Sequence, residues 1–156
     1  MTGTTAEDAL AALGLTLPAA PAPAANYVPY VRTGDLLHVS GQVSRNETGL
    51  IVGRLGEDLD VAGGAVAAQS CALALIAQLR AACGGDLGRL RRVVKLTGFV
   101  ASAPGFGDQP LVVNGASDLM VAVFGEKGRH ARSAVGVAAL PFGVAVEVEA
   151  VFEIER

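Results

Sequence analysis

Charged side chains are scarce in this chain. Asp, Glu, Lys and Arg make up 17% of its 156 residues, whereas an average globular domain has about a quarter. Hydrophobic residues make up 51% and aromatic residues only 4%, with no tryptophan. A chain of this length can bury the core of one ordinary domain. With so few charges for the outside, we expect another subunit to cover part of its surface.

Positive charge is limited as well. The chain has 12 Lys and Arg residues against 15 Asp and Glu, which gives a net charge of -3. Its basic residues are scattered, apart from a short run between residues 89 and 95. Proteins that bind nucleic acids usually carry a concentrated basic surface. The composition therefore argues against a nucleic-acid partner.

Cysteine and histidine are rare, with two residues of each. Cys71 and Cys83 fall on one expected helix, about 18 Å apart along its axis at 1.5 Å per residue. A disulfide needs Cα atoms within about 7 Å, so we expect two reduced core thiols. No Cys or His pair has the spacing of a metal site, and we expect no bound metal.

The first fifteen residues, MTGTTAEDALAALGL, have no basic segment and contain two acidic residues. We therefore expect no signal peptide. We also expect no membrane span, because no apolar run is expected to reach the roughly 20 residues that cross a bilayer. Together with the reduced cysteines, these features predict a cytoplasmic protein that does not bind a membrane.

Local patterns predict three helices and six strands. The helices are expected at residues 5–15, 60–82 and 111–124, and the strands at 30–32, 36–43, 50–52, 90–101, 131–139 and 144–154. A connector with four prolines follows the first helix. This order predicts an α+β sandwich, in which two helices pack on one face of one mixed or antiparallel sheet. Residues 1–24 would form an N-terminal extension, and residues 25–156 the domain.

The last two strands are predicted to form a hairpin that closes around residues 140–143. In that register Arg132 and Glu147 share a face, about 13 Å apart at 3.3 Å per residue, with Ala134 and Gly136 between them. Small residues between a cation and a carboxylate leave room for a ligand with its own carboxylate, which the fork of Arg132 would bind. The alternative is a solvated sheet face, on which Arg132 pairs with one of the glutamates of the last strand.

Three other side chains are weighed as candidates. His130 could act as an acid or base at the mouth of such a pocket, and a surface histidine is the alternative. His38 shares a strand face with Ser40, and a packed or interfacial histidine is the alternative. Cys71 lies in an apolar helix, which favours a core residue over a nucleophile.

Several separated segments resemble the Rid family, the reactive intermediate deaminases, also called YjgF-like or endoribonuclease L-PSP-like proteins. The segments are VPYVR, VSGQV, RVVKLTGFV, VNGASDL and HARSAVGVAALPFGVAVEVEA. The last contains the family's most specific pattern: an Arg-Ser pair, a strand that ends in Leu-Pro, and a strand with Glu-x-Glu. The resemblance extends from about residue 25 to the end. The extension before it resembles a longer subgroup of the family.

The resemblance implies a chorismate-mutase-like fold, assembled as a homotrimer with pockets at the subunit interfaces. It implies hydrolysis of enamines or imines that carry a carboxylate, such as 2-aminoacrylate, to 2-keto acids and ammonia, without a metal or organic cofactor. The family's carboxylate-binding arginine falls on Arg132, and its water-activating glutamate on Glu147. The other pocket positions fall on Tyr30, Ser40, Gly41, Asn114 and Ala134, the last of which is often cysteine in shorter members.

Two other functions stay open. A non-catalytic trimer could bind a keto acid or a related small metabolite without turning it over. An endoribonuclease is the third alternative, and both the acidic composition and the lack of a catalytic histidine pair argue against it.

Overall fold

Five strands form one sheet in the order β1-β2-β7-β5-β6. The computed structural model describes residues 3–156. The strands are β1 (Tyr30–Thr33), β2 (Leu36–Val43), β5 (Leu90–Ala101), β6 (Ala131–Val137) and β7 (Val146–Ile154), and β3 (Arg45–Asn46) pairs with β4 (Gly49–Leu50) in a separate small ribbon. Neighbouring strands of the main sheet are antiparallel except for β5 and β6, which are parallel. The sheet is therefore mixed.

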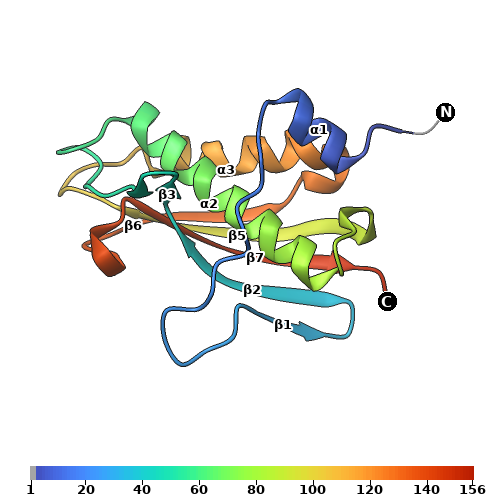
Figure 1. Cartoon of the computed structure of the whole chain (residues 1–156). Coiled ribbons are helices and arrows are strands. Elements are labelled where there is room, and N and C mark those ends of the chain that lie inside the picture. Colours follow the sequence, from blue (N-terminus) through green and yellow to red (C-terminus); the bar gives the residue numbers. More distant parts are fainter. Residues whose placement is uncertain (1–2) are drawn as a thin grey trace.

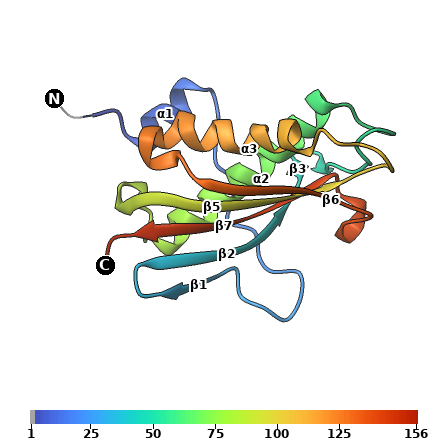
Figure 2. The ribbon, with the colours of Figure 1, turned by 180° about the vertical axis from the view of Figure 1, so that it is seen from behind.

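Three helices lie on one face of this sheet (Figures 1 and 2). They are α1 (Ala6–Ala12), α2 (Val61–Ala82) and α3 (Gln109–Phe124), and three short 3-10 turns, η1 (Leu87–Arg89), η2 (Gly125–Gly128) and η3 (Pro141–Gly143), join the elements. The core lies between α2, α3 and the sheet. We call the other side of the sheet, which carries no helix, the open face. The predicted α+β sandwich is confirmed, with α1 as an additional element of the helical layer.

Capping residues mark both ends of α2 and the start of α1, whereas α1 ends at Ala12 instead of residue 15 and α3 begins at Gln109 instead of residue 111. Asp60 caps α2, since its side chain accepts a hydrogen bond of 2.8 Å from the Gly63 amide. The helix stops before Gly84, whose left-handed φ of 67° ends the regular backbone. Thr5 caps α1 in a capping box with Asp8. These local interactions explain why the sequence alone places the helices well.

Helix α2 corrects the expectation about membrane spans. It is long and apolar enough to cross a bilayer, judged by length and composition alone. However, 56% of its most apolar window is buried within the fold, where it packs against α3 and the sheet. A helix that is apolar on most sides packs on two surfaces, and this packing accounts for the apolar character of α2.

The predicted hairpin between the last two strands is wrong. Strand β6 pairs only with β5, in a parallel register that places Arg132 beside Leu96. Strand β7 lies on the other side of β5 and places Glu147 beside Phe99. The chain β5-α3-β6 forms a strand-helix-strand crossover, and such a crossover brings its second strand parallel to the first. The short loop after β6 then carries the chain past the end of β5.

The strand expected at residues 50–52 is also shorter than predicted. Regular pairing ends at Leu50, and Val52 forms only an isolated bridge with Val144. This bridge joins the start of β7 to the segment that leads into α2.

The N-terminal extension packs on the rest of the chain. Leu10 of α1 belongs to the hydrophobic core, and α1 contacts α3. The connector then passes α2 on its way to β1 (Figure 1), where buried Gln78 donates a hydrogen bond of 2.7 Å to the Pro21 carbonyl. Residues 1 and 2 of the predicted extension lie outside the described residues, and a domain boundary at residue 24 stays a prediction.

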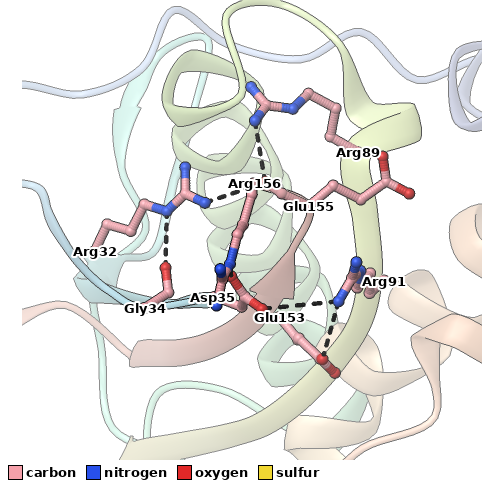
Figure 3. A network of polar contacts seen from close by, with 8 residues as sticks. All are labelled: Arg32, Gly34, Asp35, Arg89, Arg91, Glu153, Glu155 and Arg156. Atoms are coloured by element: carbon pink, nitrogen blue, oxygen red, sulfur yellow. Dashed lines mark hydrogen bonds and ion pairs between the residues drawn. The ribbon is translucent and has the colours of Figure 1, made fainter.

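A network of polar contacts lies at the end of the sheet where β7 stops. Asp35 lies at its centre, 3.8 Å from Arg91 and 3.0 Å from Arg156. Two further arginines donate to the backbone carbonyl of Glu155, at 3.2 and 3.0 Å (Figure 3). Much of the chain's basic charge is therefore engaged in holding the C-terminus to the β1-β2 turn and to β5.

Candidate functional site

Arg132 lies on the helical face of the edge strand β6, because its partner Leu96 is a core residue. Its half-buried guanidinium reaches α3, where Nη1 donates to Asn114 Oδ1 at 2.8 Å and to Ser117 Oγ at 3.1 Å. Nη2 donates to the Pro110 carbonyl at 3.3 Å. Three oxygens from one helix therefore hold the orientation of this side chain.

All three of these oxygens belong to neutral groups. None of the salt bridges formed within residues 3–156 includes Arg132. Three of the five guanidinium N–H groups are engaged, and the remaining ones include Nε–H. A fixed guanidinium with free donors and an unneutralised charge is suited to binding a carboxylate through two parallel hydrogen bonds.

Close packing between α2 and α3 places Asn114. A Cβ at Gly115 would collide with the backbone carbonyl of Ala65 in α2, so glycine lets the two helices approach. Close helix packing is therefore the reason for a glycine inside α3, where it costs about 1 kcal/mol relative to alanine. Ala134, two residues after Arg132, lies opposite Gly98 and packs against the core.

Glu147 lies on the open face, beside Val43 and Phe99 in the neighbouring strands. A bulge at residues 40 and 41 interrupts the pairing of β2 with β7 there. The Glu147 carboxylate lies against Gly41, and a Cβ at that position would collide with it. Burial raises the pKa of the Glu147 carboxyl above its ordinary value, and the negative charge of Glu149 raises it further. A raised carboxyl pKa is typical of a general base that works near neutral pH.

A cavity of about 470 Å³ opens beside Glu147. The proline-rich connector forms one wall through residues Pro21 to Ala25 and Tyr27, and the loop before β7 contributes Phe142. Phe142 is 67% exposed and has a φ of 60°, a conformation that costs energy for residues other than glycine. An exposed aromatic side chain held in this conformation at a cavity rim suggests a contact with a ligand or with another subunit.

Two predicted pocket residues lie elsewhere. Tyr30 is opposite Val39 and packs against the core, and Tyr27 lines the cavity in its place. The Ser40 hydroxyl donates to the Val28 carbonyl at 2.8 Å, so it holds the connector. Successive side chains of a strand point to opposite faces of the sheet. The sequence did not indicate which of these faces carries the core, so it did not show that Tyr30 turns inward.

The predicted site residues thus form two groups. Arg132 and Asn114 meet on the helical face, and Glu147 and Gly41 meet on the open face. This corrects the expectation that Arg132 and Glu147 share a face, because β5 lies between their strands and each pairs with a residue of opposite orientation in β5. Within a single chain the two groups cannot line one pocket.

Ser117 is a partner of Arg132 that was not predicted from the sequence. The spacing of Asn114 and Ser117, three residues apart on a helix, places them on one face and could have indicated it. His130 lies next to this pair, with Nε2 2.8 Å from Ser117 Oγ and Nδ1 2.6 Å from the Gly128 carbonyl oxygen. It is therefore part of the Arg132 group and is not a free surface histidine.

The two cysteines are free and buried, as predicted. Burial raises the pKa of the Cys71 thiol far above its ordinary value, and the negative charge of Glu147 raises it further. Such a thiol stays protonated and does not act as a nucleophile. No group of three His, Cys, Asp or Glu side chains in the described part of the chain could hold a metal ion.

Comparison with known proteins adds to this geometry. Residues 7–153 match the family described as "YjgF/chorismate mutase-like, putative endoribonuclease". The chain belongs to this family. It is 57% identical to protein TCP17 of Trypanosoma cruzi over 146 residues, which are 92% of this chain and 91% of TCP17.

Solved structures of YjgF-family relatives share the fold. Protein Atu1372 of Agrobacterium tumefaciens, described as having unknown function, is 51% identical with a TM-score of 0.90, over 96% of this chain and 92% of its own. An endoribonuclease-like protein of Shewanella oneidensis is 36% identical with a TM-score of 0.92, over 96% and 99%. RidA of a Psychrobacter species is 30% identical with a TM-score of 0.58, over 86% and 94%.

Proposed function

We propose that this protein hydrolyses small imines and enamines that carry a carboxylate, such as 2-aminoacrylate, to 2-keto acids and ammonia. The observation that carries the proposal is the anchored guanidinium of Arg132. It is held by neutral oxygens only, so its charge is available to the carboxylate of a substrate. Membership of the YjgF family supports this choice, since one relative of similar fold is named RidA.

We further propose that each active site lies between two subunits of a homotrimer. Arg132 and Asn114 of one subunit would face Glu147 and the connector cavity of its neighbour. The open face supports this assembly, because it exposes apolar side chains with no helix to cover them. Val31 on this face is 54% exposed and Val135 44% exposed. These two side chains lie on the edge strands β1 and β6, where a neighbouring subunit would cover them.

The proposed reaction needs only positioning and proton transfer. An enamine first becomes its imine tautomer by gaining a proton on carbon and losing one from nitrogen. Glu147 takes a proton from water, whose oxygen bonds to the imine carbon while the C=N electron pair moves to nitrogen. Glu147 returns this proton to the nitrogen, and the carboxylate then transfers the proton of the new hydroxyl to the nitrogen as well. The C–N bond breaks as the C=O bond forms, which releases ammonia and the 2-keto acid. Arg132 holds the carboxylate next to the reacting carbon throughout, which lowers the entropic cost of the attack.

Non-catalytic binding of a keto acid is the second candidate, and the same Arg132 site would serve it. Several relatives are described as endoribonucleases, but the described basic residues give this function little support. Arg91 and Arg156 are engaged with Asp35, and net charge is negative. Two free, buried cysteines are in keeping with the reducing cytoplasm that we propose as its location.

The decisive experiment generates 2-aminoacrylate in situ and follows the loss of its imine with and without the protein. We expect a clear acceleration that is lost in both Arg132→Ala and Glu147→Ala, each checked for folding and assembly. Mixing the two inactive variants in one trimer should restore part of the activity, because some interfaces then contain one intact Arg132 and one intact Glu147. Unchanged hydrolysis by Arg132→Ala would refute the proposal. Tight pyruvate binding without any acceleration would favour the binding protein.

A further inference from the structure

His130 and Ser117 form a chain of hydrogen bonds that ends on Arg132. The Gly128 carbonyl can only accept, so the 2.6 Å contact requires a hydrogen on Nδ1 of His130. In neutral histidine the other ring nitrogen, Nε2, is then an acceptor. Nε2 lies 2.8 Å from Ser117 Oγ, and the serine hydroxyl must donate to it. For the neutral ring, the contact with Gly128 thus fixes the tautomer with hydrogen on Nδ1.

This assignment also settles the role of the serine oxygen. Because the single hydroxyl hydrogen of Ser117 points to His130, its lone pairs are turned away from the imidazole. Arg132 Nη1 donates to the same oxygen at 3.1 Å. The direction of donation therefore runs from Arg132 to Ser117 to His130. At every contact of this hydrogen-bond chain, a donor therefore faces an acceptor.

We propose that His130 is a positioning residue for the anion site, acting through Ser117 on the guanidinium of Arg132. The inference rests on the proposed function, in which Arg132 binds a substrate carboxylate. His130 keeps the hydroxyl of Ser117 oriented as an acceptor for Arg132. Together with Asn114, this acceptor restrains the two hydrogens on Nη1 and leaves Nε–H for the ligand.

The hydrogen-bond chain joins two elements that follow each other in the sequence. Ser117 lies in α3, three residues after Asn114, and so presents its side chain on the same helical face. His130 lies just before β6, at the end of the turn that returns from α3 to the sheet. Helix α3 and the residues that lead into β6 thus hold the two ends of the hydrogen-bond chain. His130 and Arg132, which are two residues apart in the sequence, both contact the hydroxyl of Ser117.

Two substitutions of His130 separate its hydrogen bonds. In His130→Gln, the amide oxygen can take the place of Nε2 and accept from Ser117. In His130→Asn, the shorter amide can take the place of Nδ1 and keep the Gly128 contact, but it leaves Ser117 without its acceptor. The pair changes size and polarity similarly and differs in which contact is kept.

The test measures binding of pyruvate, the keto-acid product of 2-aminoacrylate hydrolysis, by calorimetry on the full-length assembled protein. We expect His130→Asn and Ser117→Ala each to weaken binding about tenfold, in line with the loss of one hydrogen bond that supports a charged group. The double variant should be no weaker than either single one, because both break the same chain. His130→Gln should recover most of the affinity.

Hydrolysis provides a second readout. At low imine concentration the rate should fall in His130→Asn, while at saturating imine it should stay within about twofold of the original protein, because neither residue touches the attacking water. Thermal unfolding of each variant checks that the fold is intact.

The outcomes distinguish this inference from the proposed function. If Arg132→Ala loses pyruvate while His130→Asn and Ser117→Ala bind it normally, the anion site stands and the positioning role is refuted. Additive losses in the double variant would also refute it, since the two residues would then act separately. Normal pyruvate binding by Arg132→Ala would remove the anion site itself, and with it the proposed function.

Discussion

Arg132 and Glu147 lie on opposite faces of one sheet, with β5 between their strands. Arg132 faces α3, where Asn114 and Ser117 hold it, and Glu147 faces the side without helices, where it lies over Gly41. Side chains on opposite faces of a sheet are separated by the sheet's own thickness and backbone. A pocket that uses both must therefore be built from two copies of the chain.

This relationship restricts the possible assemblies. If one subunit offers its helical face at the edge strand β6 and the next offers its open face, the two surfaces in contact are different. Contacts between different surfaces form a closed ring when the rotation between subunits closes and an open filament when it does not, and a ring of three subunits would contain three equivalent sites. The geometry thus agrees with the assembly that the family resemblance implies.

We expect pyruvate binding to need a neutral side chain at Asn114 that accepts a hydrogen bond from Arg132. Asn114→Ala removes one acceptor from Arg132 and should weaken pyruvate binding about tenfold, the usual effect of a hydrogen bond to a charged group. Asn114→Asp should weaken it more, because a carboxylate there would pair with Arg132 and neutralise its charge. Calorimetric titration of both variants measures the difference. Asn46→Asp, in the exposed β3-β4 ribbon, is the matched control, and an aspartate variant that binds better than the alanine variant would contradict this account.

Gly41 is expected to be required for activity but not for anion binding. Its Cβ in Gly41→Ala would collide with the Glu147 carboxylate and displace it from the bulge. We expect at least a tenfold loss of imine hydrolysis, since small displacements of a catalytic group are costly, with pyruvate affinity changed less than threefold. Gly107 has open space around it, and Gly107→Ala provides the control for an added methyl group. Full activity in Gly41→Ala would show that the position of Glu147 is unimportant.

Glu147 is expected to reduce stability at neutral pH. Burial and Glu149 raise the pKa of its carboxyl in the folded state, so the folded protein binds this proton more tightly than the unfolded chain does. The free energy of unfolding therefore falls as pH rises from the ordinary glutamate value through the raised one. Glu147→Gln carries no such charge, and its Tm should exceed that of the original protein by roughly 1–3 °C at pH 7.

The same comparison below the ordinary glutamate pKa should show no difference, because both side chains are then neutral. Differential scanning calorimetry at the two pH values measures this change. Glu47→Gln, at an exposed position, should leave the Tm unchanged at both. A lower Tm for Glu147→Gln at pH 7 would mean that the carboxylate is stabilised in the fold, against the direction of its pKa.

The open face is expected to be the subunit interface. Val135→Asp places a charge on this face beside Phe99, and burying an unpaired charge in an interface is unfavourable. The variant should sediment as a smaller species than the original protein at the same concentration. Val66 is more exposed still, at 61%, but lies in α2 on the helical layer, so Val66→Asp should leave the mass unchanged. The reverse result would place the interface on the helices.

Local signals in the sequence predicted most of the elements. Strand β5 and helix α2 have the expected ends to within one residue, because Asp60, Gly84 and the Val-rich run from residue 90 act on their immediate neighbours. The strand pairing at the C-terminus was predicted wrongly. Strands β6 and β7 are antiparallel in direction and joined by a short loop, which are the features of a hairpin, and nothing local indicates that β5 separates them.

The residues of the candidate site stay a prediction, and the geometry expected for two of them was wrong. Arg132 and Asn114 were identified through the family motif, and the structure brings them together. The assumed hairpin register placed Arg132 and Glu147 on one face, and the pairing of both strands with β5 overturns it. Ser117 and Tyr27 were missed, because neither stands out until α3 and the connector are packed against their neighbours.

The sequence by itself determined the fold class, the helices, the reduced core cysteines and the residue types of the site. These follow from composition, from caps and from the periodicity of one segment at a time. The tertiary structure decided which strands are neighbours, that the crossover β5-α3-β6 places Arg132 on the helical face, and that His130 reaches Arg132 through Ser117. A period of two shows which residues share a face within a strand, but the partner of that strand depends on how the whole chain buries its apolar surface.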